Sequence, residues 1–313
     1  MASPNDIVLI DHQSIDRQKW DNCIDRSPNG SICIYSWFLD ILSPKWQALV
    51  LGDYLLIMPL PIQSKLGFPA LLQPLFIQQL GVFGTESISP VITQQFIDHI
   101  PHTIQLVDYH FNRLNSFSET RFVQQLPNLV LPLNKPYTDL YGAYSLNLKR
   151  KLKKINEANF ILSKDGDALE VVNLFKRFNR KITGAISEKW YNKLYRVIES
   201  CSARGMAEVW IVKDADDVLV AGIVLLQSVK HKRIILNLIA MSDVGREANA
   251  GAWLIDQFIQ ARAEDDFVFD FEGSKHKGVA RFYQSFGAIS ETYPRYHKNW
   301  KIFRFLTLVK AIF

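Results

Sequence analysis

The strongest constraint on the fold lies in the second half of the chain, where three strand-like segments precede a helix that separates two apolar strands. The three segments are 207–213, 218–229 and 233–241, and each is rich in branched apolar residues and bounded by turn residues. A helical pattern over 250–263 then leads into a short apolar strand at 267–271. A helix that crosses between two strands favours a parallel pair inside a mixed sheet. This order predicts an α/β or α+β fold. It does not fit a Rossmann fold, because no glycine-rich turn follows a first strand.

The remaining segments extend the same mixture of helices and strands over the whole chain. Apolar residues at helical spacing predict helices at 14–24, 34–42, 90–100, 146–156, 168–182, 188–200 and 279–285. Apolar runs predict further strands at 46–51, 54–62, 103–111 and 289–300. The stretch 128–141, with Pro132 and Pro136, is the best candidate for an interdomain connection. We therefore expect two domains, residues 1–140 and 141–313.

Size and composition limit the classes of protein that remain. The 313 residues, 48% of them hydrophobic, can form the cores of two ordinary domains. The net charge of +5 is mild and suits an anionic ligand such as a nucleotide or tRNA, although solubility alone explains as much. The cysteines Cys23, Cys33 and Cys201 lack CxxC spacing, so we expect neither a disulfide framework nor a metal site. No signal peptide or membrane span is visible, which predicts a cytoplasmic protein.

Three separated pieces of the second half resemble one known family. The basic opening at 145–154, Ser-Leu-Asn-Leu-Lys-Arg-Lys-Leu-Lys-Lys, resembles the Ser…Arg-Arg…Lys-Lys start of the acetyltransferase domain in Fem-type proteins. The run 241–246, which leads into 250–254, stands where GNAT proteins place their donor-binding strand, loop and helix. The most specific piece combines Asp-Phe-Glu-Gly at 270–273 with Gly-Val-Ala-Arg-Phe-Tyr-Gln-Ser-Phe-Gly-Ala at 278–288. It is similar to the family ending DF-x-G…G-h-x-x-F-[KY]-x-x-F-G-A.

Residues 144–290 thus resemble an acyltransferase domain of the GNAT superfamily, most like the Fem-type branch. The resemblance implies tandem GNAT-like domains, each a mixed, mostly antiparallel sheet flanked by helices, although the first half has no motif of its own. It also implies a bacterial enzyme that transfers an acyl group to an amine without a metal. Acyl-CoA is the first-choice donor, because Tyr283 is retained. The alternatives are an aminoacyl-tRNA donor acting on a cell-wall precursor, or a catalytically silent binding or scaffold protein.

The donor-binding region implied by the resemblance follows the third strand of the second half. GNAT proteins bind a pyrophosphate at the N-terminus of the next helix, where backbone N–H groups are free, with the signature Arg/Gln-x-x-Gly-x-Gly/Ala. Here Ala248 and Asn249 stand where the first glycine is expected, and Glu247 would repel a phosphate. The alternative is a solvated turn that leads into a core-facing helix. The residues expected to bind the donor are Met241, Ser242, Arg246, Ala250 and Gly251.

Tyr283 aligns with the tyrosine of the GNAT motif Tyr-x-x-x-Gly-Phe, which serves as general acid toward the leaving thiolate. An unperturbed tyrosine has a pKa near 10 and is therefore protonated at neutral pH. In Fem-type proteins this position is often lysine. The alternative is an aromatic side chain that packs beside Phe282 and Phe286 under the last strand.

We expect Asp270 and Glu272 to alternate on a strand, with both carboxylates on one face of the sheet and Phe269 and Phe271 on the other. A carboxylate near a cleft can activate an amine through water. Glu272 is therefore a candidate catalytic residue. The resemblance gives Asp270 a mainly structural role, and we also single it out as a substrate-binding residue.

The basic helix at 146–156 contains Lys149 and Arg150, which we single out as substrate-binding residues for tRNA or phosphate. Its apolar residues recur at helical spacing, so a half-buried helix with a solvated basic face is the alternative. The acceptor is expected to be an amine, either a small molecule or a cell-wall precursor. The tail at 300–313 mixes basic and apolar residues and fits either a membrane surface or a helix docked on the first domain.

Overall fold

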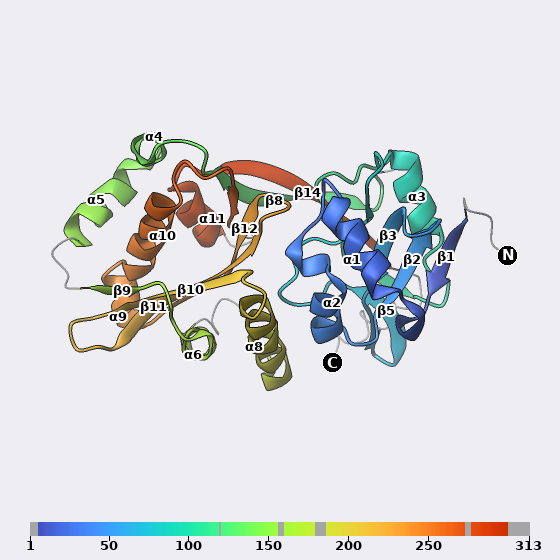
Figure 1. Cartoon of the computed structure of the whole chain (residues 1–313), viewed down its shortest axis with the longest axis horizontal. Helices are drawn as coiled ribbons and strands as arrows, with labels where there is room; N and C mark the ends of the chain where they lie inside the picture. Colours follow the sequence, from blue (N-terminus) through green and yellow to red (C-terminus); the bar gives the residue numbers. More distant parts are fainter. Residues whose placement is uncertain (1–5, 119, 156–159, 179–185, 273–276, 300–313) are drawn as a thin grey trace, which may run out of the picture. The chain divides into compact units, whose positions relative to one another are not determined.

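A computed structural model describes residues 6–118, 120–155, 160–178, 186–272 and 277–299. These residues form two compact units, the first from Met1–Leu126 with Thr292–Phe313 and the second from Pro127–Glu291 (Figure 1). The chain passes from unit 1 to unit 2 within β8 (Val123–Pro132) and returns within β14 (Ile289–Asn299). This division differs from the boundary expected at residue 140, because residues 127–140 belong to unit 2 and the end of β14 belongs to unit 1.

Unit 1 contains two groups of strands. The first is β1 (Ile7–Ile10), β2 (Gln47–Leu51), β3 (Leu56–Leu60) and β6 (Phe83–Gly84), each antiparallel to the next. In the second, β4 (Ile62–Lys65) pairs antiparallel with β5 (Phe68–Leu72), and β5 pairs parallel with β7 (Leu106–His110). The end of β14 pairs antiparallel with β7. Sequence patterns predicted β2, β3 and β7, but not β1, β4, β5 or β6, nor the return of the last strand to unit 1.

The helices of unit 1 lie close to where their patterns predict them. They are η1 (His12–Ser14), α1 (Arg17–Arg26), η2 (Ile32–Ile34), α2 (Ser36–Leu42) and α3 (Pro90–Asp98). The helix expected from Ser14 begins later, because Asp16 caps α1 by accepting a hydrogen bond from the Lys19 backbone N–H.

Unit 2 is built on a mixed sheet in the order β8-β13-β12-β11-β10-β9. The strands are β9 (Ile161–Ser163), β10 (Ala207–Lys213), β11 (Leu219–Ser228), β12 (Arg233–Met241) and β13 (Val268–Asp270). Only β12 and β13 are parallel among these neighbours. The predicted antiparallel run of three strands and the parallel pair after a helix crossing are both confirmed.

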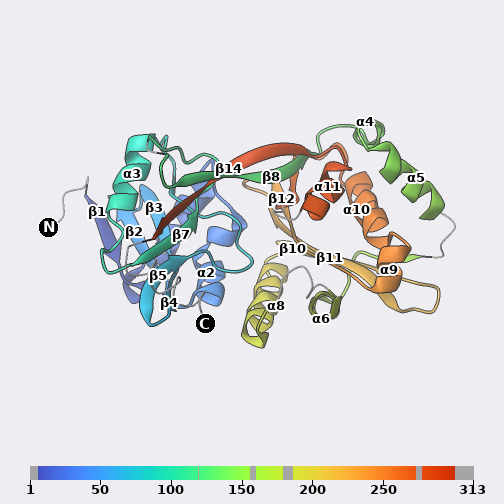
Figure 2. The ribbon, with the colours of Figure 1, turned by 180° about the vertical axis from the view of Figure 1, so that it is seen from behind.

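Helices cover both faces of the sheet of unit 2 (Figures 1 and 2). They are α4 (Tyr137–Gly142), α5 (Leu146–Ile155), α6 (Ala168–Phe178), α8 (Glu188–Ser202), α9 (Asp243–Glu247), α10 (Ala250–Ala261) and α11 (Lys277–Gln284). Ile223 of β11 belongs to the core beneath α10, whereas a side chain at the neighbouring Gly222 would meet Val171 of α6. Successive strand residues point to opposite faces, so α10 and α6 lie on opposite sides. The mixed α/β fold expected from the sequence is confirmed.

The stretch 128–141 is not the connection that its prolines suggest. Val130, Leu131 and Pro132 of β8 pair antiparallel with β13 across a long interval of sequence. Leu129 and Leu131 are buried in the core of unit 2. Residues that follow the strand form α4, so most of this stretch is part of the second fold.

Candidate functional site

The parallel strands β12 and β13 pair over a short distance and then part. Their register joins Arg233 to Val268, Ile234 to Phe269 and Ile235 to Asp270. β12 continues to Met241, whereas β13 ends at Asp270. From Leu236 onward, no strand in the described part of the chain pairs with this side of β12. The divergence leaves a strand edge at the carboxyl end of a parallel pair, where ligands of α/β sheets commonly bind.

Asn237 lies on this edge and is the extra residue of a β-bulge. Val224 pairs with Leu238 and Leu225 pairs with Leu236, so no residue of β11 stands opposite Asn237. Both polar atoms of its side-chain amide are buried and have no hydrogen-bond partner among the described residues. Leaving a buried polar group unpaired costs about 1–3 kcal/mol, so this amide needs an explanation. Sequence reasoning missed it, although a single asparagine inside an apolar strand was the available signal.

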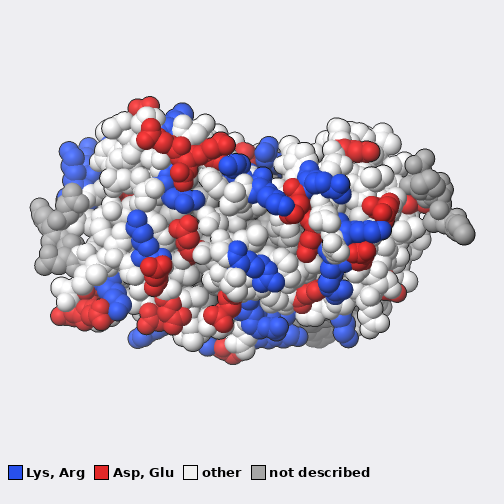
Figure 3. All heavy atoms as spheres, viewed as in Figure 1, with Lys and Arg blue, Asp and Glu red and all other residues white. Residues whose placement is uncertain are grey.

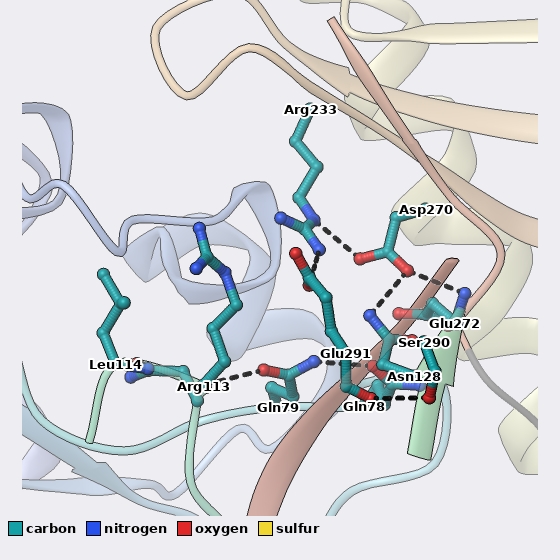
Figure 4. Close-up of polar contacts among 11 residues, drawn as sticks. Gln78, Gln79, Arg113, Leu114, Asn128, Arg233, Asp270, Glu272, Ser290 and Glu291 are labelled. Carbon is teal, nitrogen blue, oxygen red and sulfur yellow. Dashed lines mark hydrogen bonds and ion pairs between the residues drawn. The ribbon is translucent and has the colours of Figure 1, made fainter. Parts of the chain in front are cut away.

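Asp270, at the end of β13, accepts hydrogen bonds from two side chains of unit 2. Its Oδ2 accepts a hydrogen bond from Arg233 Nε at 2.6 Å, and its Oδ1 accepts one from Asn128 Nδ2 at 3.0 Å. Arg233 also donates from Nη2 to Glu291 Oε2 at 3.1 Å (Figure 4). The Asp270 side chain is only 5% exposed and that of Arg233 is 20% exposed. Asp270 is therefore a paired, buried carboxylate, in keeping with a structural role.

Glu272 follows immediately and is the most perturbed acid at the site. Its backbone N–H donates to Asp270 Oδ1 at 2.8 Å, and its φ of 48° lies in the left-handed region, which is costly for a residue other than glycine. Part of the residue is accessible, yet burial of its carboxyl group, with the nearby charge of Asp270, raises the pKa of Glu272 to about 8. The prediction that Glu272 and Asp270 alternate on one strand is wrong, because β13 ends at Asp270.

Tyr283 lies on α11 and packs against the residue between these two acids. Its ring stacks on Phe271 at a centroid distance of 4.8 Å, and the residue is 6% exposed. Burial and the nearby charge of Glu272 both raise the pKa of the Tyr283 hydroxyl. Tyr283 is therefore protonated at neutral pH. The packing expected as its alternative role is also present, because Phe282 and Phe286 lie beside it in the same core.

The region expected to bind the donor is a short helix, not an open glycine loop. Ser242 caps α9 by accepting a hydrogen bond from the Gly245 N–H at 3.0 Å. Arg246 pairs with Asp243 at 3.2 Å and donates to the Phe178 carbonyl at 2.9 Å, and its side chain remains 34% exposed. Ser242 and Arg246 are thus the polar members of the predicted set, and both are partly exposed, as is Met241.

The other three predicted donor-binding residues pack inside the domain. Ala250 and Gly251, at the start of α10, are buried. A side chain at Gly251 would come within 2.3 Å of the Met241 sulfur, so the space left by the glycine is filled by Met241. The N-terminus of α10 therefore offers a pyrophosphate less room than the GNAT pattern implies. Asn249, in the left-handed conformation, makes the turn before the helix.

Lys149 and Arg150 lie on α5, whose Leu148 and Leu152 are buried. Lys149 Nζ donates to the Gly142 carbonyl at 2.7 Å and lies 5.4 Å from the ring centre of Tyr141. No contact among the described residues joins Lys149 or Arg150 to Asp270 or Glu272. Figure 3 shows basic and acidic side chains interspersed over one face of the molecule. The basic side of α5 is therefore a feature separate from the acidic site.

The described residues offer neither a metal-binding cluster nor a membrane-spanning helix. These contain no group of three or more His, Cys, Asp or Glu side chains that could hold a metal ion. The helices in the described ranges include none that is long and apolar enough to cross a membrane. The tail at 300–313, for which a membrane contact was one expectation, lies outside the described residues.

Comparison with known proteins supports this reading of the fold. Residues 144–284 match the family model described as an acetyltransferase (GNAT) domain. A FemX crystal structure aligns with 90% of this chain and 96% of its own, at 10% identity and a TM-score of 0.63. L-PGS from Bacillus licheniformis aligns with 95% of this chain and 96% of its own, at 10% identity and a TM-score of 0.54.

A third solved structure shares the fold over nearly the whole chain. The C-terminal domain of a putative lysylphosphatidylglycerol synthetase from Agrobacterium fabrum covers 95% of this chain and 96% of its own, at 11% identity and a TM-score of 0.57. No curated protein sequence matches the chain. Structural likeness at this identity concerns the fold, while the family model concerns the sequence of unit 2. Residues 144–284 thus match a GNAT-type acetyltransferase domain, and the chain as a whole shares the fold of the FemX structure.

Proposed function

We propose that this chain transfers an acyl group from a thioester donor to an amine, at the site where β12 and β13 diverge. The observation that carries the proposal is the strand edge left where β12 and β13 part, next to which Glu272 follows the end of β13 with its pKa raised to about 8 by burial and Asp270. Perturbed acids of this kind concentrate at functional sites. The left-handed backbone at Glu272 also costs conformational free energy, and strain of this kind is found mainly at functional sites.

Glu272 fits the role of general base toward an amine. Aliphatic amines are mostly protonated at neutral pH, so the nucleophile must lose a proton before or during attack. A base works best when its pKa lies near the operating pH, and a carboxylate with a pKa of about 8 meets that condition. In this step the amine nitrogen bonds to the acyl carbon, and its proton passes to Glu272, directly or through one water.

Tyr283 fits the role of proton donor to the leaving group. When the carbon–sulfur bond of the donor breaks, the departing thiolate needs a proton, and Tyr283 holds one because its pKa is raised. Its ring is fixed by stacking on Phe271, so the hydroxyl is held in one place. A tyrosinate left after the transfer would regain its proton from water.

Asn237 and Asp270 fit supporting roles. The Asn237 amide carries two N–H donors that no described residue uses, and a donor at a strand edge can stabilise the oxyanion formed on the acyl carbonyl. Asp270 is a positioning residue, because its Oδ1 accepts the Glu272 backbone N–H while Arg233 neutralises its charge. These hydrogen bonds fix the backbone of Glu272. Among the described residues they do not involve its carboxylate, which is left to act as the base.

Acyl-CoA is the donor that we favour. The support is the match of residues 144–284 to an acetyltransferase model, together with the retained Tyr283. Within the predicted loop, Arg246 and Ser242 are the polar side chains that would contact a phosphate. The Arg246 guanidinium already pairs with Asp243, so a phosphate would have to share it. Binding at this loop is therefore expected to be modest and to depend on Arg246.

An aminoacyl-tRNA donor acting on a cell-wall precursor is the second candidate. The observation that favours it is the alignment of FemX over 90% of this chain, together with the basic side of α5 at Lys149 and Arg150. Binding of tRNA releases counterions and weakens steeply as salt is raised, whereas binding of CoA changes much less. Salt dependence of binding therefore separates the two donors.

The test combines donor binding with turnover by the full chain. Thermal shifts are measured with CoA and acetyl-CoA for the wild type, Arg246→Ala and the exposed control Arg204→Ala. We expect a shift that grows with ligand, as mass action requires, and that fades only in Arg246→Ala. Thiol release from acetyl-CoA is then followed with a panel of amino acids and amino sugars.

The turnover arm tests the site itself. We expect kcat/KM to rise with pH through an apparent pKa of about 8 and this rise to vanish in Glu272→Gln. Glu264→Gln is the matched control, because Glu264 is exposed and has the same left-handed backbone, with a φ of 68°. No shift with either thioester, but salt-sensitive binding of aminoacyl-tRNA, would move the assignment to the second donor. Absence of binding and of turnover with both donors would favour a scaffold protein.

A further inference from the structure

Unit 2 contains a pocket that shares no residue with the site around Glu272. It lies between α4, α5 and α10, which Figure 2 shows close together in space, and its volume is about 280 Å³. Its wall is formed by aromatic rings of α4 and α10, by Leu152 and Lys153 of α5, and by a polar stripe of α10. No step proposed above uses any of these residues.

A buried acid in the pocket wall is the first unusual feature. Asp256 is 5% exposed and is the one charged residue of α10, and its Oδ1 accepts a hydrogen bond from the Tyr137 hydroxyl at 2.9 Å. The buried Tyr144 hydroxyl also approaches this carboxyl group, without good hydrogen-bond geometry. Among the described residues no Lys, Arg or His forms an ion pair with Asp256. A buried carboxylate without a cation is costly, so a ligand with N–H donors would satisfy it.

The polar stripe of α10 extends this recognition surface. Trp253, Asp256, Gln257 and Gln260 all line the pocket, and their spacing places them on one face of the helix. Two amide side chains next to a carboxylate offer both donors and acceptors for a planar, hydrogen-bonding ligand. Because most of α10 is buried in the core, this face is rigidly held.

Aromatic rings also line the pocket and provide flat surfaces. Tyr137 and Tyr141 of α4 lie with ring centroids 5.7 Å apart, and Trp253 of α10 faces the same space. Stacking of a base on an aromatic side chain contributes about 1–3 kcal/mol in nucleic-acid complexes. A planar heterocycle therefore suits this pocket better than an aliphatic chain does.

The rim of the pocket is basic. Lys153 is part of the wall, and the Lys149 ammonium lies 5.4 Å from the ring centre of Tyr141. These charges disfavour a ligand that is only cationic, although Asp256 and the aromatic rings would otherwise suit one. They favour a ligand that carries an anion on the same molecule as its N–H donors.

We propose that the pocket between α4, α5 and α10 binds a purine nucleotide, with the base against Asp256 and the phosphate at Lys153. Guanine is the preferred base, because its Watson–Crick edge has two adjacent N–H donors that one carboxylate can accept. Adenine presents one donor beside one acceptor, which would face Asp256 with like polarity. The nucleotide site is distinct from the acyl-transfer site and does not depend on that proposal.

The test is calorimetric titration of the full chain with GMP, AMP and guanosine. We expect GMP to bind at least tenfold more tightly than AMP or guanosine. Asp256→Asn should reduce GMP affinity at least tenfold, and Tyr137→Phe, which keeps the ring, should reduce it less. Lys153→Ala should weaken GMP binding and lower its salt dependence, whereas Lys154→Ala, on the same helix but outside the pocket wall, should not.

The outcomes that overturn the proposal are equally specific. The proposal is overturned if GMP does not bind at millimolar concentration or if AMP binds equally well. It is also overturned if the two lysine variants have equal effects, or if free lysine binds in place of a nucleotide. Asp256→Asn could lose the fold, so the comparison of Lys153→Ala with Lys154→Ala and the ranking of the three ligands stand without it. Because the readout is binding, failure here is separable from failure of the acyl-transfer assay.

Discussion

Replacing Glu272 by glutamine should make the protein more stable at neutral and alkaline pH. Burial and Asp270 raise the pKa of Glu272 from 4.5 to about 8, so the folded protein favours the neutral acid. Between these two values the native state binds more protons at this group than the unfolded state. The free energy of unfolding therefore falls as pH rises through this window. Glutamine resembles the neutral acid and does not ionise, so the variant escapes the loss.

The size of the effect follows from the same shift. One pKa unit corresponds to about 1.4 kcal/mol, so the full shift of Glu272 corresponds to about 5 kcal/mol above pH 8 and about 3 kcal/mol at pH 7. Near pH 4.5 the contribution vanishes, because Glu272 is then neutral in the folded state and half-neutral in the unfolded state. Domains have total stabilities of about 5–15 kcal/mol, so the difference is easily measured.

The assay is urea-induced unfolding of the wild type, Glu272→Gln and the control Glu264→Gln at intervals from pH 5 to pH 9. We expect the stability of Glu272→Gln relative to the wild type to grow steadily from pH 5 to pH 8 and then to level off. Glu264 is exposed, so its variant should track the wild type at every pH. A difference between Glu272→Gln and the wild type that does not change with pH would refute the reasoning, because it would mean that Glu272 ionises normally.

Two further predictions concern the framework of the site. Arg233→Ala should lower the free energy of unfolding by about 3–5 kcal/mol in urea titrations, because Asp270 would be left buried without its cation, whereas the exposed Lys230→Ala should change it little. Equal effects of these two variants would contradict the pairing. Gly245→Ala should lower the melting temperature, because the new methyl group would come 2.1 Å from the Val220 carbonyl oxygen. Gly278→Ala, where nothing lies within 4 Å on α11, should raise the stability by about 0.5–1 kcal/mol, and the reverse order of melting temperatures would count against this packing.

Local patterns in the sequence were sufficient for most elements of unit 2. The apolar stripe of α10 and the short apolar run of β13 place a helix between two strands, and a helical crossover of this kind usually joins parallel strands. The motif Asp-Phe-Glu-Gly also indicated Asp270 and Glu272, because residue type and spacing can be seen in the sequence itself.

The features that only the tertiary structure reveals depend on residues far apart in the sequence. β8 was taken for a connection because its partner, β13, lies far along the chain, and pairing of that kind leaves no local signal. The pKa of Glu272 and the unpaired amide of Asn237 could not be predicted either. Both depend on which groups surround a buried side chain and on a bulge in the register of two strands. Periodicity specifies which residues form a helix or a strand, whereas desolvation and charge are properties of the folded environment.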